Sequence, residues 1–200
     1  MILLSGPISP YVRIVRVQIE HCRLQDQVEV RMVATRVADS PVHPHNPTGK
    51  IPTLIVDDDH AIGEARLICE HLDGCHDGAP FAPTQQTLAA RAFEGMAVGF
   101  LDGMAVWIRE ARRPGNEQSP GIIEQEQARA LRCLAYLAAN TPWQHQPLDY
   151  ARTCIGITLW RMRYSLPDFD WPGQFPELAS WHKRFMAQPE LDRTGPPQTS

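Results

Sequence analysis

The first residues able to do chemistry lie near the N-terminus, in the stretch SGPISPYVR (5–13). Ser9-Pro10 has the residue types of a helix start, with serine as the N-cap and proline at the first helical position. The same hydroxyl is also able to donate a hydrogen bond to a reacting group. The sequence leaves both roles open for Ser9.

A second candidate is Pro52, which stands directly before an apolar run in NPTGKIPTLIV (46–56). Proline has no N–H to donate to a neighbouring strand. If the Ile51–Pro52 bond is cis, the chain turns and leaves the backbone groups of Ile51 to pair with a peptide-like ligand. The alternative is an ordinary edge strand that begins with proline.

A third candidate is Glu64, at the start of an expected helix over residues 64–73, EARLICEHLD. A carboxylate there is favoured by the helix dipole alone. It would also accept the ammonium of an amino-acid ligand, while the backbone N–H groups of Ala65 and Arg66 held the α-carboxylate. The two interpretations are compatible.

The cysteines and histidines do not predict a metal site. The five cysteines form no CxxC pair, which is typical of reduced, mostly buried thiols in a cytosolic protein. The densest cluster is CEHLDGCHDG, with Cys69, His71, Cys75 and His76. On a helix, Cys69 and His71 point in different directions. We therefore expect a helix end followed by a polar turn, and no metal.

Composition excludes several classes of protein. The chain has 200 residues, 43% of them apolar, and a net charge of −4. These values are typical of a folded globular protein, not of a disordered one. Nucleic acid is not expected as a partner, because no cluster of Lys and Arg is present. No apolar run reaches the roughly 20 residues of a membrane helix, and no basic region precedes the first apolar stretch as in a signal peptide.

The first 75 residues alternate between strand and helix patterns. Strands are predicted over 1–5, 27–33, 53–58 and 60–62. Helices are predicted from Pro10 to about residue 22 and over 64–73, the second with Leu67, Ile68 and Leu72 facing inward and Gly74 as its stop. The order βαβ-ββα predicts a mixed four-stranded sheet with helices on its faces.

Beyond residue 84 only helical patterns remain. Helices are expected over 86–112, after Ser119-Pro120, after Asp149 as N-cap, and over 176–188. The predicted organisation is an α/β domain at 1–76, a linker near 75–84 and an all-helical domain at 84–200.

Taken together, these features resemble a cytosolic glutathione transferase. The resemblance rests on SPYVRIVRV, on NPTGKIPTLIVDDDHAIGEARLICEHLD and on the helical remainder, and covers nearly the whole chain. The later segments REARRP, DFDW and LDRTGPP are similar to small bacterial proteins of that kind. The resemblance implies a thioredoxin-like N-terminal domain, a C-terminal helical bundle and a cytoplasmic homodimer that takes part in detoxification.

The resemblance also implies residue roles. Pro52 would be a cis-proline, and Ile51 would offer its backbone to the cysteinyl part of glutathione. Lys50 would lie beside the glycyl carboxylate, and Glu64 and Ala65 would meet the γ-glutamyl group. The full expected set of glutathione-binding residues is Ser9, Tyr11, Lys50, Ile51, Pro52, Glu64, Ala65 and Arg66.

Ser9 would be catalytic, standing next to the sulfur. A free thiol with a pKa of about 8.5 is mostly protonated at pH 7. A hydroxyl donor and a helix N-terminus stabilise the thiolate, which then attacks an electrophilic carbon without a metal.

The sequence departs from the family pattern at Ala65, where a serine is usual. We expect weaker glutathione binding there, because one hydrogen bond worth about 0.5–1.5 kcal/mol is lost. Residues that would line an electrophile pocket, between the sheet domain and the first long helix, are Met104, Trp107, Ile108 and Arg112. Each of these is also a plausible core position, as are Trp160, Arg161 and Arg163.

The predicted function is transfer of glutathione to small hydrophobic electrophiles. One alternative is a glutathione-dependent oxidoreductase, which generally needs a cysteine where Ser9 stands. Another is a non-catalytic binding or regulatory protein of the same fold, which Ala65 favours.

Overall fold

The computed structural model describes residues 1–196 and divides into two compact units. The first unit holds residues 1–85 together with the C-terminal segment that begins at Gln188, and the second holds Gln86–Ala187. The expected helical domain at 84–200 differs from this division, since residues 188–196 group with the sheet. Residues 197–200 of that expected domain lie outside the described residues.

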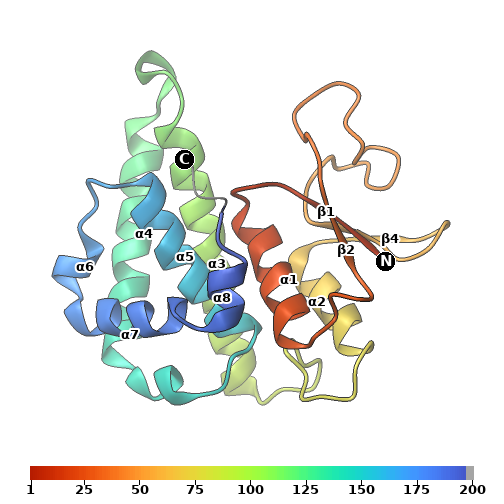
Figure 1. Cartoon of the computed structure of the whole chain (residues 1–200). Helices are drawn as coiled ribbons and strands as arrows, with labels where there is room; N and C mark the ends of the chain where they lie inside the picture. Colours follow the sequence, from red (N-terminus) through yellow and green to blue (C-terminus); the bar gives the residue numbers. More distant parts are fainter. Residues whose placement is uncertain (197–200) are drawn as a thin grey trace. The chain divides into compact units, whose positions relative to one another are not determined.

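The first unit is built on a four-stranded mixed sheet (Figure 1). Its strands are β1 (Ile2–Ser5), β2 (Glu29–Met32), β3 (Thr53–Ile55) and β4 (Ala61–Gly63), in the order β2-β1-β3-β4. β1 runs parallel to β2, and β3 is antiparallel to both β1 and β4. All four residues of β2 are exposed, as suits an edge strand. The predicted thioredoxin-like arrangement is confirmed.

Two helices of the first unit follow the predicted positions. α1 (Pro10–His21) begins at Ser9-Pro10, and α2 (Ala65–Asp73) begins after Glu64. They pack against each other, and α2 also contacts β3 and β4. The expected inward face of α2 is wrong at Leu67, which is 54% exposed, whereas Ile68 and Leu72 are fully buried. Cys69 is buried where Leu67 was expected, so the buried stripe of α2 is rotated from its predicted place.

The C-terminal segment adds a short helix, α8 (Pro189–Arg193), that the sequence did not predict. It packs on α1, where Leu191 is fully buried. Nη2 of Arg13 on α1 donates to the Leu191 carbonyl oxygen at 2.8 Å. At the surface, Glu190 pairs with His21 at 3.1 Å between Oε1 and Nδ1. These contacts explain why the segment belongs to the sheet unit.

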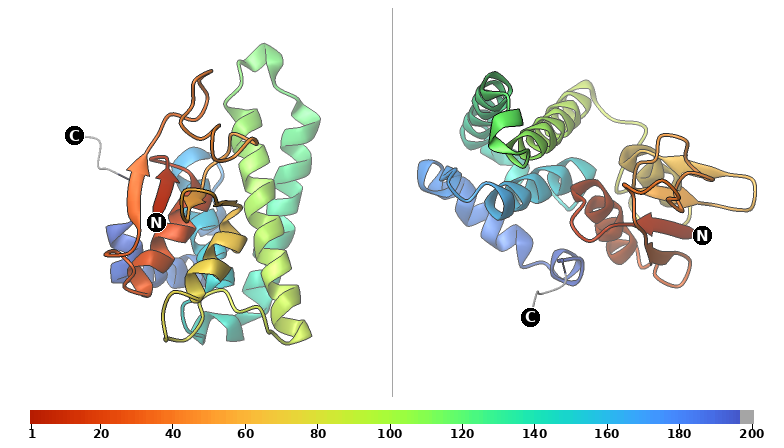
Figure 2. Two further views of the ribbon diagram at one scale, coloured as in Figure 1. Left: turned by 90° about the vertical axis from the view of Figure 1, so that its right-hand side faces the viewer. Right: turned by 90° about the horizontal axis from the view of Figure 1, so that it is seen from above.

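The second unit is entirely helical in its regular elements. Its elements are α3 (Leu88–Ala111), η1 (Gly115–Glu117), α4 (Pro120–Ala139), η2 (Thr141–His145), α5 (Tyr150–Ser165), α6 (Trp171–Gln174) and α7 (Pro176–Met186). α3 and α4 form an adjacent pair joined by a short connection (Figure 2, left). The short elements η1, η2 and α6 were not predicted. No described helix is long and apolar enough to cross a membrane.

α5 is the most buried helix of the second unit and packs against α3 and α7. Gly156 allows this close approach, because an added Cβ would overlap the ring of Phe185 on α7. At the first turn of α3, by contrast, the apolar Leu88 is 84% exposed.

Candidate functional site

Three loops of the first unit meet at one end of the sheet. Thr53 opens β3, and its register partners are Leu4 near the end of β1 and Gly63 at the end of β4. The chain segments after β1, before β3 and after β4 therefore leave the sheet side by side. These segments contain Ser9, Lys50 to Pro52, and Glu64 with Ala65. We call these six residues the sheet-end site.

Gly6 permits the closest approach within this site. A Cβ built on Gly6 would lie 2.6 Å from Cδ1 of Ile51, so any side chain there would displace the isoleucine. The loop after β1 and the loop before β3 are thus in direct contact. Only a glycine allows Ile51 to keep this position unchanged.

Asn46 organises the loop that presents Lys50 and Ile51, and sequence reasoning missed it. Its side-chain nitrogen donates to Oγ1 of Thr53 at 2.9 Å and to the Lys50 carbonyl oxygen at 3.3 Å. Its side-chain oxygen accepts from the N–H of Thr48 at 3.1 Å. The signal was present as an asparagine opening the turn-rich stretch NPTGK, since Asn side chains readily bond the backbone two residues on.

The Ile51–Pro52 peptide bond is cis, as the resemblance implied. Pro52 is buried and Ile51 is half-buried. Lys50 is exposed, and its carbonyl oxygen accepts from Oγ1 of Thr53 at 2.8 Å. The Lys50 side chain therefore stands at the surface, whereas its backbone is held by the start of β3.

Glu64 has a backbone conformation that side chains rarely adopt. Its φ is 65° and its ψ is 123°, in the left-handed half of conformational space. Such a conformation costs about 1–3 kcal/mol and is concentrated at functional sites. The Glu64 side chain is exposed and makes no capping hydrogen bond to α2. The first turn of α2, which begins at the buried Ala65, is therefore without a side-chain cap.

The positions of Arg66 and Tyr11 support their expected glutathione-binding roles less directly. The Arg66 guanidinium pairs with Glu70 one turn along α2, at 3.4 Å, and donates to the Pro83 carbonyl oxygen at 2.9 Å. Its side chain thus holds the segment that follows α2. Tyr11 is half-buried in the first turn of α1. The glutathione-binding roles of both residues stay predictions. For Arg66, the predicted contact is made by its backbone N–H group.

Ser9 performs the predicted helix-capping role. Its Oγ accepts a hydrogen bond from the Val12 N–H at 3.4 Å, a long distance for this contact. A hydroxyl that accepts a bond keeps its own proton to donate. Capping and donation to a thiolate are therefore compatible.

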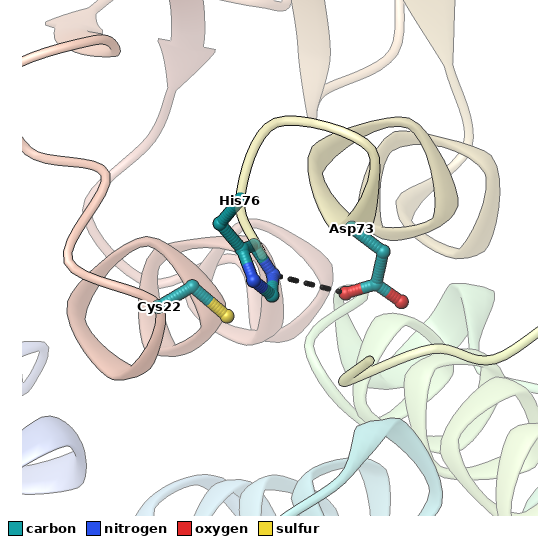
Figure 3. A group of neighbouring side chains, drawn as sticks. All are labelled: Cys22, Asp73 and His76. Carbon is teal, nitrogen blue, oxygen red and sulfur yellow. Dashed lines mark ion pairs between the residues drawn. The ribbon is translucent and has the colours of Figure 1, made fainter. Parts of the chain in front are cut away.

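A second group of polar side chains lies at the opposite ends of α1 and α2 (Figure 3). Cys22 follows α1, Asp73 ends α2 and His76 lies in the next turn, with ligand-type atoms all within 4.8 Å of one another. Of the cluster seen in the sequence, only His76 belongs to this group. Cys22 was missed because it is far away along the chain.

The contacts of this group give it a structural role. The Asp73 carboxylate accepts from Nε2 of Gln18 at 2.8 Å, from the Phe81 N–H at 2.9 Å and from the Ala82 N–H at 2.7 Å. These bonds tie the segment after α2 to both helices.

His76 and Cys22 are also affected by their local surroundings. Nδ1 of His76 accepts from the Gly78 N–H at 3.0 Å, so the neutral ring carries its proton on Nε2, 3.6 Å from Asp73. Burial, together with the nearby Asp73 charge, raises the pKa of Cys22 to about 11.

The expected electrophile-pocket residues lie in the second unit. Met104, Trp107 and Ile108 are 2%, 5% and 5% exposed, and the Trp107 ring meets Phe169 edge-on at 4.9 Å. Arg112 is exposed at the end of α3. The first three have the burial of core residues, and a pocket role for all four stays a prediction.

The sheet with its cis-proline loop, and the helical unit that follows it, define the glutathione transferase fold. Residues 8–75 match the family model described as the glutathione S-transferase N-terminal domain. The chain is therefore similar to glutathione transferases in the sequence of its sheet unit and in its fold.

Solved structures share this fold over nearly the whole chain. A glutathione transferase of Methylobacillus flagellatus KT with glutathione bound is 29% identical, with a TM-score of 0.87 and 98% of each chain covered. A family member from Pseudomonas fluorescens Pf-5 with bound glutathione is 26% identical, with a TM-score of 0.88 and 98% of each chain covered. The same Pseudomonas protein was also solved with S-(propanoic acid)-glutathione, at a TM-score of 0.86.

Among curated proteins, the uncharacterized GST-like protein YibF of Escherichia coli (strain K12) is 23% identical over 167 residues. That alignment covers 80% of this chain and 82% of YibF.

Proposed function

We propose that this protein binds glutathione at the sheet-end site and transfers it to small hydrophobic electrophiles. The observation that carries the proposal is the left-handed Glu64 directly before the uncapped first turn of α2. A strained residue persists only where the surrounding structure holds it, and such residues mark functional sites. The proposal includes the cytoplasmic homodimer and the detoxification role implied by the resemblance.

The chemistry at each position follows from the groups available. The Glu64 carboxylate would accept the ammonium of the γ-glutamyl residue, and the Ala65 N–H at the helix start would donate to its carboxylate. The backbone of Ile51 would pair with the cysteinyl part. Lys50 would neutralise the glycyl carboxylate from the surface.

In the proposed reaction, the Ser9 O–H donates to the glutathione sulfur and stabilises the thiolate, whose proton leaves to solvent. The thiolate then forms a carbon–sulfur bond, and the leaving group departs with its electron pair. S-(propanoic acid)-glutathione, found in the Pseudomonas relative, is a thioether of the kind that such a step produces.

The cysteine nearest to Ser9 in the sequence gives little support to the oxidoreductase alternative. Cys22 lies at the far end of α1, and its raised pKa keeps the thiol protonated. A non-catalytic glutathione-binding protein remains the second candidate, because Ala65 lacks the usual hydroxyl.

The test combines calorimetric titration of glutathione with an aryl-halide conjugation assay. Wild-type protein should bind glutathione at millimolar concentration or below. Ser9→Ala should keep that binding and lose about 10- to 100-fold in turnover, since a hydrogen bond to a charged group is removed.

A matched control exists in the same chain. Ser119 precedes Pro120 and caps α4 by accepting from the Ile122 N–H, as Ser9 does for α1. Ser119→Ala should lower the free energy of unfolding by about 1 kcal/mol, as expected for the loss of one helix cap, without changing turnover. Absence of glutathione binding would overturn the whole proposal. Equal turnover in wild type and Ser9→Ala would remove only the role of Ser9.

A further inference from the structure

Arg161, on the last part of α5, is a buried cation. It is only 4% exposed, and its Nη1 atom is buried without a hydrogen-bond partner. Among residues 1–196, no carboxylate forms an ion pair with its guanidinium. Burying a charge is unfavourable by several kcal/mol unless an opposite charge or hydrogen bonds compensate for it.

A second guanidinium lies close to Arg161. Arg112, at the end of α3, donates from Nη2 to Oγ of Ser165 at 3.3 Å, which holds it against the end of α5. Desolvation, with the nearby Arg112 charge, lowers the pKa of Arg161. Two neighbouring positive charges, one of them buried, attract an anion.

The neighbouring aromatic rings favour an organic anion over an inorganic one. The Arg161 guanidinium lies 5.4 Å from the centroid of the Tyr164 ring, which stacks on Trp160 at 5.7 Å. Tyr164 is 54% exposed, so an apolar body has an aromatic surface to contact beside the charge. A carboxylate fits the planar fork of a guanidinium with two parallel hydrogen bonds.

We propose that Arg112 and Arg161 form a binding site for the carboxylate of a small organic acid. The site lies wholly within the helical unit. It includes Arg112, one of the expected electrophile-pocket residues, so the inference rests on the proposed function, although benzoate binding is measured without glutathione. The competing explanation is structural, since a cation near a helix C-terminus is stabilised by the helix dipole. That explanation provides no hydrogen-bond acceptor for Nη1 of Arg161, and it does not account for the neighbouring Arg112.

The experiment titrates the full-length protein with benzoate, by calorimetry and by tryptophan fluorescence. Benzamide serves as the uncharged analogue of the same shape, and inorganic phosphate as an anion without an organic body. We expect benzoate to bind with a dissociation constant of about 1 mM or lower, and benzamide and phosphate to bind at least about tenfold more weakly.

Two variants and one control locate the site. Arg112→Gln changes an exposed residue, so it should fold normally and weaken benzoate binding about tenfold. Arg161→Lys keeps the charge without the planar fork and should weaken binding to a similar or greater extent. Arg109→Gln removes another exposed guanidinium from α3, one that bonds the Ala105 carbonyl oxygen of its own helix, and should leave binding unchanged.

Each contrary result overturns the proposal. Equal affinity for benzoate and benzamide would show that the charge is not recognised. Phosphate binding as tightly as benzoate would replace the organic acid with an inorganic anion. Loss of binding in Arg109→Gln to the same degree as in Arg112→Gln would mean a general charge effect. No binding up to about 20 mM benzoate would leave Arg161 with a structural role only.

Discussion

The sheet unit and the helical unit present their candidate ligand groups in different ways. At the sheet-end site, the important groups are largely backbone ones: the amide groups of Ile51, the strained Glu64 and the first turn of α2. In the helical unit the candidates are side chains on α3 and α5, most of them buried. Turn chemistry and strand register fix the first kind of site, and packing fixes the second.

This difference teaches where substitutions should be tolerated. A backbone-built site tolerates many side-chain changes near it without loss of stability. A site built from buried side chains has no such freedom, because the same residues also fill the core. Four predictions test the contrast, from the largest expected effect to the smallest.

Trp107→Ala should lower the free energy of unfolding by about 3–5 kcal/mol, because it removes a ring that packs edge-on against Phe169. Urea denaturation measures this change. Leu88→Ala, on the same helix but at an exposed position, is the control and should cost less than about 0.5 kcal/mol. If Trp107→Ala left stability intact and altered only activity, the contrast between the two units would fail.

The Cys22 thiol should react slowly in the folded protein. Its pKa is raised from 9.0 to about 11, so little thiolate exists at pH 8. Iodoacetamide labelling followed by mass spectrometry should show a rate about 10- to 100-fold below that of the same thiol in urea. The rate in the folded state should keep rising until about pH 11. Fast labelling at neutral pH would instead favour redox chemistry in the sheet unit.

Glu64→Gly should separate stability from binding. Glycine adopts the left-handed conformation freely, so we expect a gain of about 1 kcal/mol in the free energy of unfolding. The same change removes the carboxylate, and glutathione should bind about tenfold more weakly. Glu64→Gln keeps the backbone strain, so it should show the weaker binding without the gain in stability. A loss of stability in Glu64→Gly would refute strain at this position.

Ala65→Ser should strengthen glutathione binding by about two- to tenfold, since it restores one hydrogen bond at the start of α2. Calorimetry measures the change, and conjugation turnover should rise less than affinity does. Unchanged affinity would indicate that backbone groups alone hold the γ-glutamyl carboxylate at this position.

The sequence was most informative where local chemistry determines structure. Ser9-Pro10 and Ser119-Pro120 both predicted helix starts, and both serines cap their helices. Pro52 and Glu64 predicted the loop before β3 and the start of α2, and the observed strand register brings these segments together at the end of the sheet.

Tertiary packing determines which of several similar residues is buried. The type of a single residue in the sequence does not reveal this. Leu67 and Cys69 are both apolar and two residues apart, so only the position of the neighbouring elements selects which one is buried. The contacts that hold Asp73 come from α1 and from the segment after α2. Arg161 has no local signal at all, because a buried arginine near a helix end resembles an exposed one in sequence.

The position of α8 has a consequence for synthesis of the chain. Leu191 packs against α1 and supplies an acceptor for the buried Arg13, yet it leaves the ribosome only after the whole helical unit. The helical unit, which is continuous in sequence, is made in full before that moment. The sheet unit therefore begins first and is completed only after the helical unit, and a nascent chain must protect the exposed face of α1 until α8 emerges.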